Sequence, residues 1–203
     1  MAESPQSPEV RCGIYAAQRG LAITGNLGRG VHGSVYSSNT ITAIKGHKQP
    51  ESYRRELDCY NRLMEQNVTE IYGHHVPQLV SYDDDFLVIE ITIVTPPFLL
   101  DFGGAYLDWP PEFSDEVMEQ WASDKQEQFG KRWASVQRIL AFLRDVHGIY
   151  MLDVNPGNIM FGGEWGRRGK PRRVVSCELW VASGGVANSR FAVFSNACRR
   201  RHG

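Results

Sequence analysis

The sequence has few of the features that would place the chain in a membrane or outside the cell. In 203 residues no run of eighteen apolar residues occurs, so we expect no membrane span. The first ten residues, MAESPQSPEV, lack the basic-then-apolar layout of a secretory signal. No C-x-x-C pair links the four cysteines, which predicts free thiols in a reducing cytoplasm and disfavours a zinc site or disulfide framework. The cysteines are Cys12, Cys59, Cys177 and Cys198.

Net charge is also nearly absent, at −1, but it is unevenly distributed. The chain has 22 Lys/Arg and 23 Asp/Glu residues. Nine of the Lys/Arg and two of the Asp/Glu lie from Gly162 onward, so residues 1–161 contain 13 Lys/Arg and 21 Asp/Glu. The body therefore carries −8 and residues 162–203 carry +7. These last residues also lack Asp, Ile, Tyr and Met. A shifted reading frame, a retained intron or a truncated gene model would produce such a composition, and we treat 162–203 as a basic tail without an assigned structure.

Local patterns predict a β-rich segment followed by a helix. Residues 21–48 indicate strands on either side of a glycine turn, and residues 51–66 are rich in helix formers. Residues 76–94 predict two more strands, split by the acidic turn 83–85. The helix face is traced by Tyr53, Leu57, Tyr60 and Met64, with Leu63 beside them. The Pro-, Ser- and Glu-rich residues 1–20 predict a short disordered lead-in.

The following segment predicts an irregular connector and a long helix. Pro and Gly residues mark the connector between 96 and 111, and a helical period then runs from about Asp115 to Val146. Its apolar face consists of Phe129, Trp133, Val136, Leu140, Leu143 and His147. After this helix, the compact loop LDVNPGN leads into the apolar run 159–161.

A glycine motif lies between the first two predicted strands. Gly28, Gly30, Gly33 and Val35 fit the pattern G-x-G-x-x-G-x-V. Glycines without a β-carbon let a backbone hairpin lie close over phosphates and donate N–H groups to them. A tight turn without a ligand would use the same residues, so the context decides. A dinucleotide-binding fingerprint would open a helix, whereas these glycines lie between strands.

A lysine and a glutamate follow at suggestive positions. Lys45, preceded by Ala43 on the next predicted strand, could reach phosphates as a fixed point charge. Glu56 lies within the predicted helix and could hold Lys45 in place by an ion pair. Glu51 is the weaker candidate, because an acid at a helix start often interacts only with the helix dipole. Without the glycine motif, Lys45 would be read as an exposed strand lysine.

The strongest chemical signal is the loop that contains Asp153 and Asn158. A carboxylate and an amide five residues apart around a Pro-Gly turn can face one cleft. Asp153 could then orient and deprotonate an attacking hydroxyl, and Asn158 could bind a metal ion on the phosphates. An Asx-type turn, in which both side chains cap their own backbone, is the alternative. The order glycine loop, lysine, glutamate and loop favours the chemical interpretation.

Together these motifs give residues 21–161 a resemblance to the protein-kinase-like superfamily, including its choline and aminoglycoside kinases. The resemblance implies an α+β protein-kinase-like fold, with a small β-rich N-lobe at 21–95 and a partial helical C-lobe at 96–161. A hinge is implied near residues 90–95. It also implies ATP and Mg²⁺ as cofactors, Lys45 and Glu56 as the phosphate-positioning pair, Asp153 as the catalytic base and Asn158 as a magnesium ligand.

The chain departs from this pattern in several places. Met151 and Leu152 stand where protein kinases have His-Arg, and the phrase Asn-Pro-Gly-Asn is more similar to the small-molecule kinases. The second metal-binding acid should follow a short strand after Asn158, but the only acidic residues beyond Asn158 are Glu164 and Glu178. Glu178 is the conceivable substitute. A literal Asp-Phe-Gly at 101–103 precedes the loop, and we interpret it as a coincidence.

Three functions compete at this point. The first is a cytoplasmic, ATP-dependent phosphotransferase acting on a protein or small-molecule hydroxyl acceptor that the sequence does not identify. The second is a pseudokinase-like module that binds nucleotide or a partner without transferring phosphate, which the missing metal acid favours. The third is a nucleic-acid-binding role for the Arg-rich tail, which we rank last because the tail has no binding motif and few aromatics near its arginines.

Overall fold

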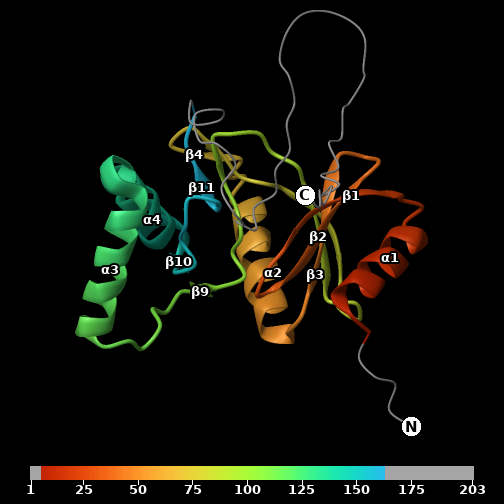
Figure 1. Ribbon diagram of the computed structural model, residues 1–203, viewed down its shortest axis with the longest axis horizontal. Coiled ribbons are helices and arrows are strands. Elements are labelled where there is room, and N and C mark those ends of the chain that lie inside the picture. Colours follow the sequence, from red (N-terminus) through yellow and green to blue (C-terminus); the bar gives the residue numbers. More distant parts are fainter. Residues whose placement is uncertain (1–5, 163–203) are drawn as a thin grey trace, which may run out of the picture.

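The computed structural model describes residues 6–162, which form a mixed α/β structure (Figure 1). Apart from Gly162, the predicted basic tail lies outside the described residues. The N-terminal half is built on an antiparallel five-stranded sheet in the order β1-β2-β3-β7-β6. The strands are β1 Ile23–Arg29, β2 Gly33–Ser38, β3 Thr42–His47, β6 Leu79–Asp83 and β7 Val88–Thr92. Helices α1 Pro8–Gln18 and α2 Pro50–Glu65 pack against this sheet.

Strand β3 has no solvent-facing side, because a helix covers each face of the sheet at this point. Alternate residues of a strand point to opposite faces. Ala43 and Lys45 face α2, whereas Ile44 and Gly46 face α1. Figure 1 shows the two helices on opposite sides of β2 and β3. All six residues of β3 are therefore buried, including the charged Lys45.

The segment predicted to be a disordered lead-in is instead helical as α1, so that prediction is wrong for residues 8–18. Ser7 caps the helix by accepting a hydrogen bond from the Val10 N–H at 3.4 Å. Pro8 lies in the first turn, where its missing N–H has no cost. Pro, Ser and Glu were thus helix-start residues rather than signs of disorder. The cluster that α1 buries against the sheet consists of Cys12, Tyr15, Ala16, Ile44 and Val88.

Helix α2 buries the face that its spacing predicted, with one exchange. Tyr53, Leu57 and Tyr60 are buried, as predicted. Leu63 is 1% exposed and Met64 is 44% exposed, so Leu63 takes the inward position. A helical repeat of 3.6 residues lets either position follow Tyr60, and packing selects Leu63.

The C-terminal half begins with a connector that contributes two short strands, β8 Phe98–Leu99 and β9 Ala105–Leu107. β8 pairs antiparallel with β11 Ile159–Met160 and, on its other side, parallel with β5 His74–His75, which in turn pairs with β4 Glu70–Ile71. β9 pairs antiparallel with β10 Ile149–Met151. These ladders place the connector alongside residues 149–160, although two helices separate them in sequence.

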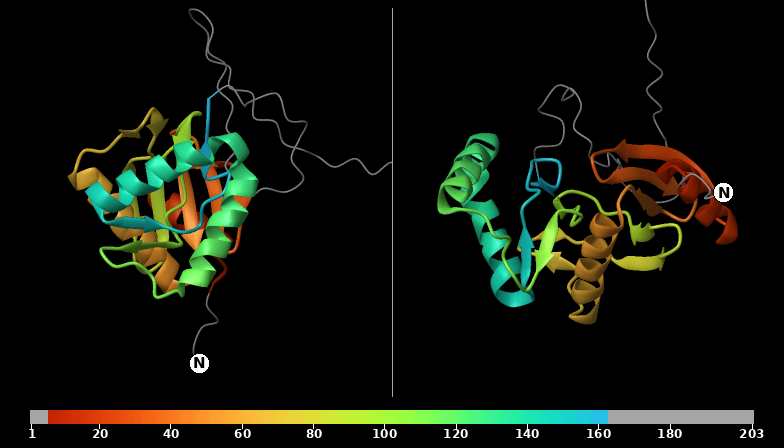
Figure 2. Two further views of the ribbon diagram at one scale, coloured as in Figure 1. Left: turned by 90° about the vertical axis from the view of Figure 1, so that its left-hand side faces the viewer. Right: turned by 90° about the horizontal axis from the view of Figure 1, so that it is seen from below.

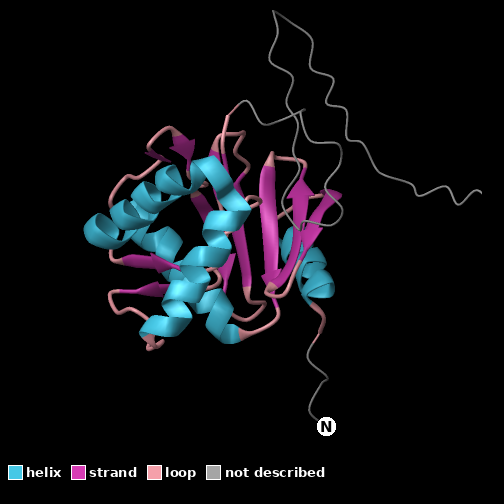
Figure 3. Cartoon of the chain, turned by 60° about the vertical axis from the view of Figure 1, so that its left-hand side comes forward, coloured by secondary structure: helices cyan, strands magenta, loops and turns pink. Residues whose placement is uncertain are grey.

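Those helices replace the single long helix predicted from Asp115 to Val146. α3 Asp115–Phe129 ends at a short 3₁₀ turn, Gly130–Arg132, and α4 Trp133–His147 follows (Figure 3). Gly130 has φ +52°, a conformation that side chains disfavour and that ends the first helix. The predicted apolar face is buried apart from the partly buried Leu140.

One hydrophobic core runs through both halves of the molecule. It extends from Ala43 and Ile89 of the sheet, through α2 and Phe102 of the connector, to Val136 of α4. Figure 2 shows α2 between the sheet and the pair of helices α3 and α4. Within residues 6–162, every helix is too short or too polar to cross a membrane.

Candidate functional site

The glycine motif forms the turn between β1 and β2. The Gly30 N–H donates to the Gly33 carbonyl at 2.8 Å, which closes the turn. A β-carbon at Gly33 would lie 2.0 Å from the Gly46 carbonyl oxygen, so only glycine fits there. Gly28 pairs with Val35 across the hairpin. At Gly28, Gly30 and Gly33 the hairpin therefore offers backbone without side chains, which suits phosphate binding by N–H groups.

Apolar side chains from the sheet lie beside Lys45. Val35 pairs directly with Lys45 across the β2–β3 ladder, and Ala43 lies two residues before Lys45 on the same face. Ala43 is 3% exposed, and Val35 packs against the main core. This face therefore combines an apolar surface with a fixed positive charge.

Lys45 is held between two carboxylates. Its Nζ lies 2.6 Å from Glu56 Oε2 and 2.8 Å from Asp101 Oδ1, and its side chain is 8% exposed. Burial alone would lower the pKa of Lys45, but the charges of Asp101 and Glu56 outweigh this effect and raise it above the ordinary value. For Glu56 the sign is reversed, because burial disfavours the charged carboxylate. Burial raises the pKa of Glu56, although the charge of Lys45 acts to lower it. Lys45 is thus a protonated, immobilised cation inside the molecule.

Asp101 is the site residue that sequence reasoning missed, because the Asp-Phe-Gly at 101–103 had been interpreted as a coincidence. Besides Lys45, Asp101 Oδ1 accepts the Gly103 N–H at 3.3 Å. Phe102 is fully buried and packs edge-on against Tyr60 of α2, with ring centroids 5.3 Å apart. Burial would raise the pKa of Asp101, but Lys45 and the Gly103 N–H hold it below its usual value. The literal motif itself was the signal that could have found this residue.

The loop that follows β10 is ordered by its own polar groups. The Asn155 Oδ1 accepts the Gly157 N–H at 2.8 Å and the Asn158 N–H at 3.2 Å, so Asn155 makes the Asx-type turn. Asn158 donates Nδ2 to the Asp153 carbonyl at 2.9 Å. The Asp153 carboxylate itself is 42% exposed, and the Asn155 amide donates to its Oδ1 at 3.5 Å. The carboxylate is therefore open to a reacting group.

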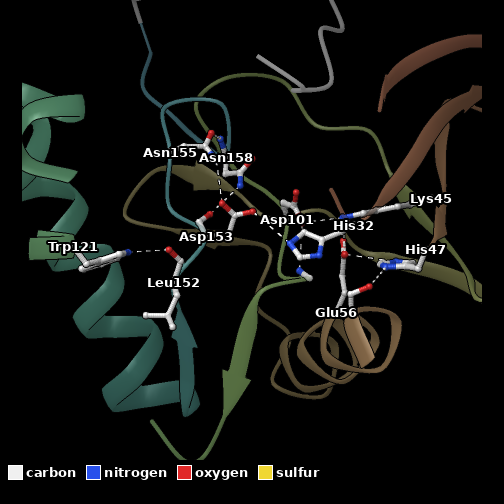
Figure 4. Close-up of polar contacts among 12 residues, drawn as sticks. His32, Lys45, His47, Glu56, Asp101, Trp121, Leu152, Asp153, Asn155 and Asn158 are labelled. Carbon is white, nitrogen blue, oxygen red and sulfur yellow. Dashed lines mark hydrogen bonds and ion pairs between the residues drawn. The ribbon is translucent and has the colours of Figure 1, made fainter. Parts of the chain in front are cut away.

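The loop is also tied to α3. Trp121 Nε1 donates to the Leu152 carbonyl at 3.2 Å, directly before Asp153 in sequence (Figure 4). Trp121 lies against Trp133 of α4, with ring centroids 6.0 Å apart. The two helices thereby fix the backbone position from which the Asp153 side chain projects.

Asp153 faces both the glycine turn and the Asp101 segment. His32, in the glycine turn, has its Nε2 3.8 Å from Asp153 Oδ2 (Figure 4). A β-carbon on Gly104 would lie 3.2 Å from Asp153 Cβ, and one on Gly103 would lie 3.1 Å from Glu56 Oε2. Residues 101–104 therefore bridge the space between Lys45 and Asp153, and they do so with small residues at the points of closest approach.

The oxygen donors at this place fit Mg²⁺. The Asn158 side chain is buried, and no residue within 6–162 donates a hydrogen bond to its Oδ1. Carboxylate and amide oxygens are hard ligands, which Mg²⁺ prefers. The described residues contain no group of three or more His, Cys, Asp or Glu side chains that could hold a metal alone. Mg²⁺ commonly takes one or two protein ligands and completes its shell with water and phosphate oxygens.

The structure thus brings Lys45, Glu56, Asp153 and Asn158 into one region beside the glycine turn. Glu51 does not join them, because it is exposed in the first turn of α2. Glu178, the substitute metal acid considered from sequence, lies outside the described residues.

Two aminoglycoside phosphotransferases are among the solved structures that this chain partly resembles. No protein-family model matches the chain, and no curated protein matches it. The aminoglycoside phosphotransferase APH(2'')-Ib with ADP bound is 15% identical, with a TM-score of 0.34, over 57% of this chain and 36% of its own. A ternary complex of streptomycin, ATP and APH(2'')-IIa is 13% identical, with a TM-score of 0.33, over 61% of this chain and 38% of its own. The chain covers well under half the length of either, and neither likeness is close enough to assign a function.

Proposed function

We propose that the chain is an ATP-dependent phosphotransferase that acts on a hydroxyl acceptor. One observation carries the proposal: the buried Lys45 ammonium is fixed between Glu56 and Asp101, on the side of the sheet that lies toward Asp153. Burying a lysine with two carboxylates is expensive unless its charge has a use or a full set of partners. A polyanion such as a triphosphate is the ligand that suits such a cation.

The nucleotide would lie between the glycine turn and the Asp153 loop. Backbone N–H groups of the turn from Gly28 to Gly33, other than the Gly30 N–H that closes it, would receive the phosphates, and Lys45 would neutralise part of their charge. The apolar face of Val35 and Ala43 would pack against the base. Glu56 acts as a positioning residue, because its contact with Lys45 holds the ammonium in one place.

Asp153 would act on the acceptor. Its exposed carboxylate would take the proton of the acceptor hydroxyl as the oxygen attacks the γ-phosphorus. The new oxygen–phosphorus bond forms while the bond from the γ-phosphorus to the β-phosphate oxygen breaks. ADP leaves, and the proton remains on Asp153 until solvent removes it. Catalysis would thus consist of positioning and charge neutralisation.

Asn158 would hold Mg²⁺ through its free amide oxygen. The ion, when bound, neutralises the phosphate oxygens and the charge that develops on the leaving group. The residues of the chain keep the amide oriented, because Asn158 Nδ2 is bonded to the Asp153 carbonyl and its N–H to Asn155.

Nucleotide binding without transfer is the second candidate. It is favoured by the side chain of His32, whose Nε2 lies 3.8 Å from the Asp153 carboxylate that the acceptor would have to reach. A chain of this kind would bind ATP and yet release no ADP.

The binding part of the proposal predicts a thermal shift with ATP. Ligand at a hundred times its dissociation constant adds about 2.7 kcal/mol to the free energy of unfolding, so the melting temperature should rise by several degrees. Lys45→Met should abolish this rise. Lys125→Met, at a partly exposed position of α3, should keep it. Glu56→Gln should reduce the shift and Glu51→Gln should not, because only Glu56 touches Lys45. An undiminished shift in Lys45→Met would refute the site.

The transfer part is tested with Asp153→Asn. Labelled γ-phosphate should pass from ATP with Mg²⁺ to at least one member of a panel of small alcohols, aminoglycosides and casein. The variant should keep the ATP shift and lose transfer. ATP binding without any ADP release in the unaltered chain would select the second candidate instead.

A further inference from the structure

We infer that Asp101 supplies the second metal-binding carboxylate of this site, from a strand that precedes the Asp153 loop in sequence and lies beside it in space. The inference rests on the proposed function and adds a residue to it. It also removes the need for an acid in residues 163–203.

Strand pairing brings Asp101 to the loop. β8 runs antiparallel to β11, with Leu99 opposite Ile159. The ladder continues one step further, because the Leu100 N–H donates to the Asn158 carbonyl at 2.8 Å. Asp101 is the next residue, so the backbone that carries its carboxylate lies beside the backbone of Asn158. Figure 4 shows Asp101 between Lys45 and the loop that carries Asp153 and Asn158.

The segment reproduces in space what the sequence seemed to lack. A metal acid was expected after a short strand that follows Asn158. The short strand β8 does lie against the segment that follows Asn158, and an aspartate comes directly after β8 and Leu100, but both are contributed by the connector. The second ladder has the same character: β9, just after the Asp-Phe-Gly, pairs with β10, just before Asp153. The strand before Asp101, β8, is thus paired with the strand after the Asp153 loop, β11. The strand after Asp101, β9, is paired with the strand before that loop, β10.

The Asp101 carboxylate has a second oxygen that could bind a metal ion. Asp101 Oδ1 accepts Lys45 Nζ and the Gly103 N–H, whereas no residue within 6–162 donates to Oδ2. The Asp101 side chain is 28% exposed, so the carboxylate group is not sealed within the core. The buried Asn158 side chain also has an amide oxygen to which no described residue donates a hydrogen bond. Two hard oxygen ligands and a phosphate would form a typical Mg²⁺ site.

The neighbouring residues keep Asp101 in place and keep side chains away from it. Phe102 is fully buried against Tyr60 and anchors the segment in the core. The β-carbon positions at Gly103 and Gly104 would lie within 3.1 to 3.2 Å of Glu56 and Asp153, so larger residues would crowd the two carboxylates. Small residues at these points leave room for an ion and phosphates.

The test compares Asp101→Asn with Glu178→Gln in the full chain, using Mn²⁺ as a spectroscopic substitute for Mg²⁺. Binding of Mn²⁺ is followed by electron paramagnetic resonance in the presence of a non-hydrolysable ATP analogue. Binding of the analogue alone, without metal, is measured by calorimetry. Asp101→Asn should weaken Mn²⁺ binding roughly tenfold or more. It should weaken metal-free nucleotide binding much less than it weakens Mn²⁺ binding, because Glu56 still holds Lys45, and Glu178→Gln should alter neither.

Three results would overturn the inference while leaving the proposed function in place. Mn²⁺ binding could survive Asp101→Asn, it could be lost in Glu178→Gln, or metal-free nucleotide binding could fall in parallel, which would make Asp101 only a positioning residue for Lys45. If Asp101→Asn does not fold, as judged by circular dichroism, Asp101→Ser replaces it with the same expectations. Failure of the unaltered chain to bind the analogue would instead refute the proposed function itself.

Discussion

At the residue scale, Lys45 and its partners place three ionised groups in or near the core. Each partner accepts one hydrogen bond from the Lys45 ammonium, Glu56 at 2.6 Å and Asp101 at 2.8 Å. A buried charge that loses its partner costs several kcal/mol, whereas a paired one is tolerated. Because Lys45 has two acids, loss of either one leaves the other in contact. This redundancy is why single substitutions at Glu56 or Asp101 should be testable in folded protein.

His47 makes the stability of the fold sensitive to acid. The ring is fully buried, and its Nε2 has no hydrogen-bond partner among residues 6–162. Burial, with the charge of Lys45, lowers its pKa to about 2. An unfolded histidine takes up a proton near pH 6.5, so between there and about pH 2 the unfolded state binds one more proton. Stability from this residue is therefore present above pH 6.5. It is lost as pH falls, by about 1.4 kcal/mol per unit.

Urea unfolding at pH 7 and pH 5 measures this effect. The unaltered chain should lose about 2 kcal/mol more than His47→Gln between the two values. Equal losses in the two proteins would show that folded His47 takes up its proton over the same pH range as the unfolded residue. In that case its Nε2, 3.6 Å from Glu56 Oε2, would be an ion-pair donor.

At the scale of elements, α1 locks onto β3 through a position that tolerates no side chain. A β-carbon on Gly46 would lie 2.7 Å from both Cys12 Sγ and the Pro8 carbonyl oxygen. Gly46→Ala should therefore push α1 off the sheet and cost about 1–3 kcal/mol. Gly13→Ala is the matched control within α1, because nothing lies within 4 Å of its β-carbon position. It should stabilise the chain by about 0.5–1 kcal/mol.

Chemical denaturation with both variants checks this expectation. A neutral Gly46→Ala would mean that α1 is not seated on β3 as the structure has it. A destabilising Gly13→Ala would point to a contact on the exposed face of α1.

The sequence predicted those strands and helices in which apolar side chains recur at the spacing of a strand or a helix. The strands between 21 and 48 and helix α2 follow from alternation and helical spacing, and the spacing of Lys45 and Glu56 led to a contact that the structure contains. α1 was missed because the Ser, Pro and Glu residues that begin the helix are also the residue types common in disordered segments. The break at Gly130 was missed because the apolar period continues through it. Asp101 was misjudged because its position depends on the pairing of β8 with β11, which no local pattern records.

At the scale of the whole molecule, Arg62 of α2 joins the two halves. It pairs with Asp108 of the connector through both oxygens, with Nη2 at 2.9 Å from Oδ2, and it donates to the His147 carbonyl at the end of α4 at 3.2 Å. Bidentate arginine–carboxylate pairs are stronger than single contacts. Arg62→Met should therefore lower the melting temperature by a few degrees and weaken ATP binding, because the Asp153 loop follows α4.

Arg54→Met, on the exposed face of the same helix, is the control and should change neither quantity. A normal melting temperature combined with normal ATP binding in Arg62→Met would mean that the shared core alone holds the halves together.

The ladder between β8 and β11 also sets the order in which the chain can be completed during synthesis. A growing chain folds from its N-terminus, and β8 emerges long before its partner. Until Ile159 leaves the ribosome, the edge of β8 that will receive β11 has no strand to pair with, and such an open edge is prone to misassociation. Lys45, Glu56 and Asp101 can meet in this interval, but Asn158 cannot. The side of the site that we propose for the metal ion therefore closes only after Asn158 and Ile159 have emerged.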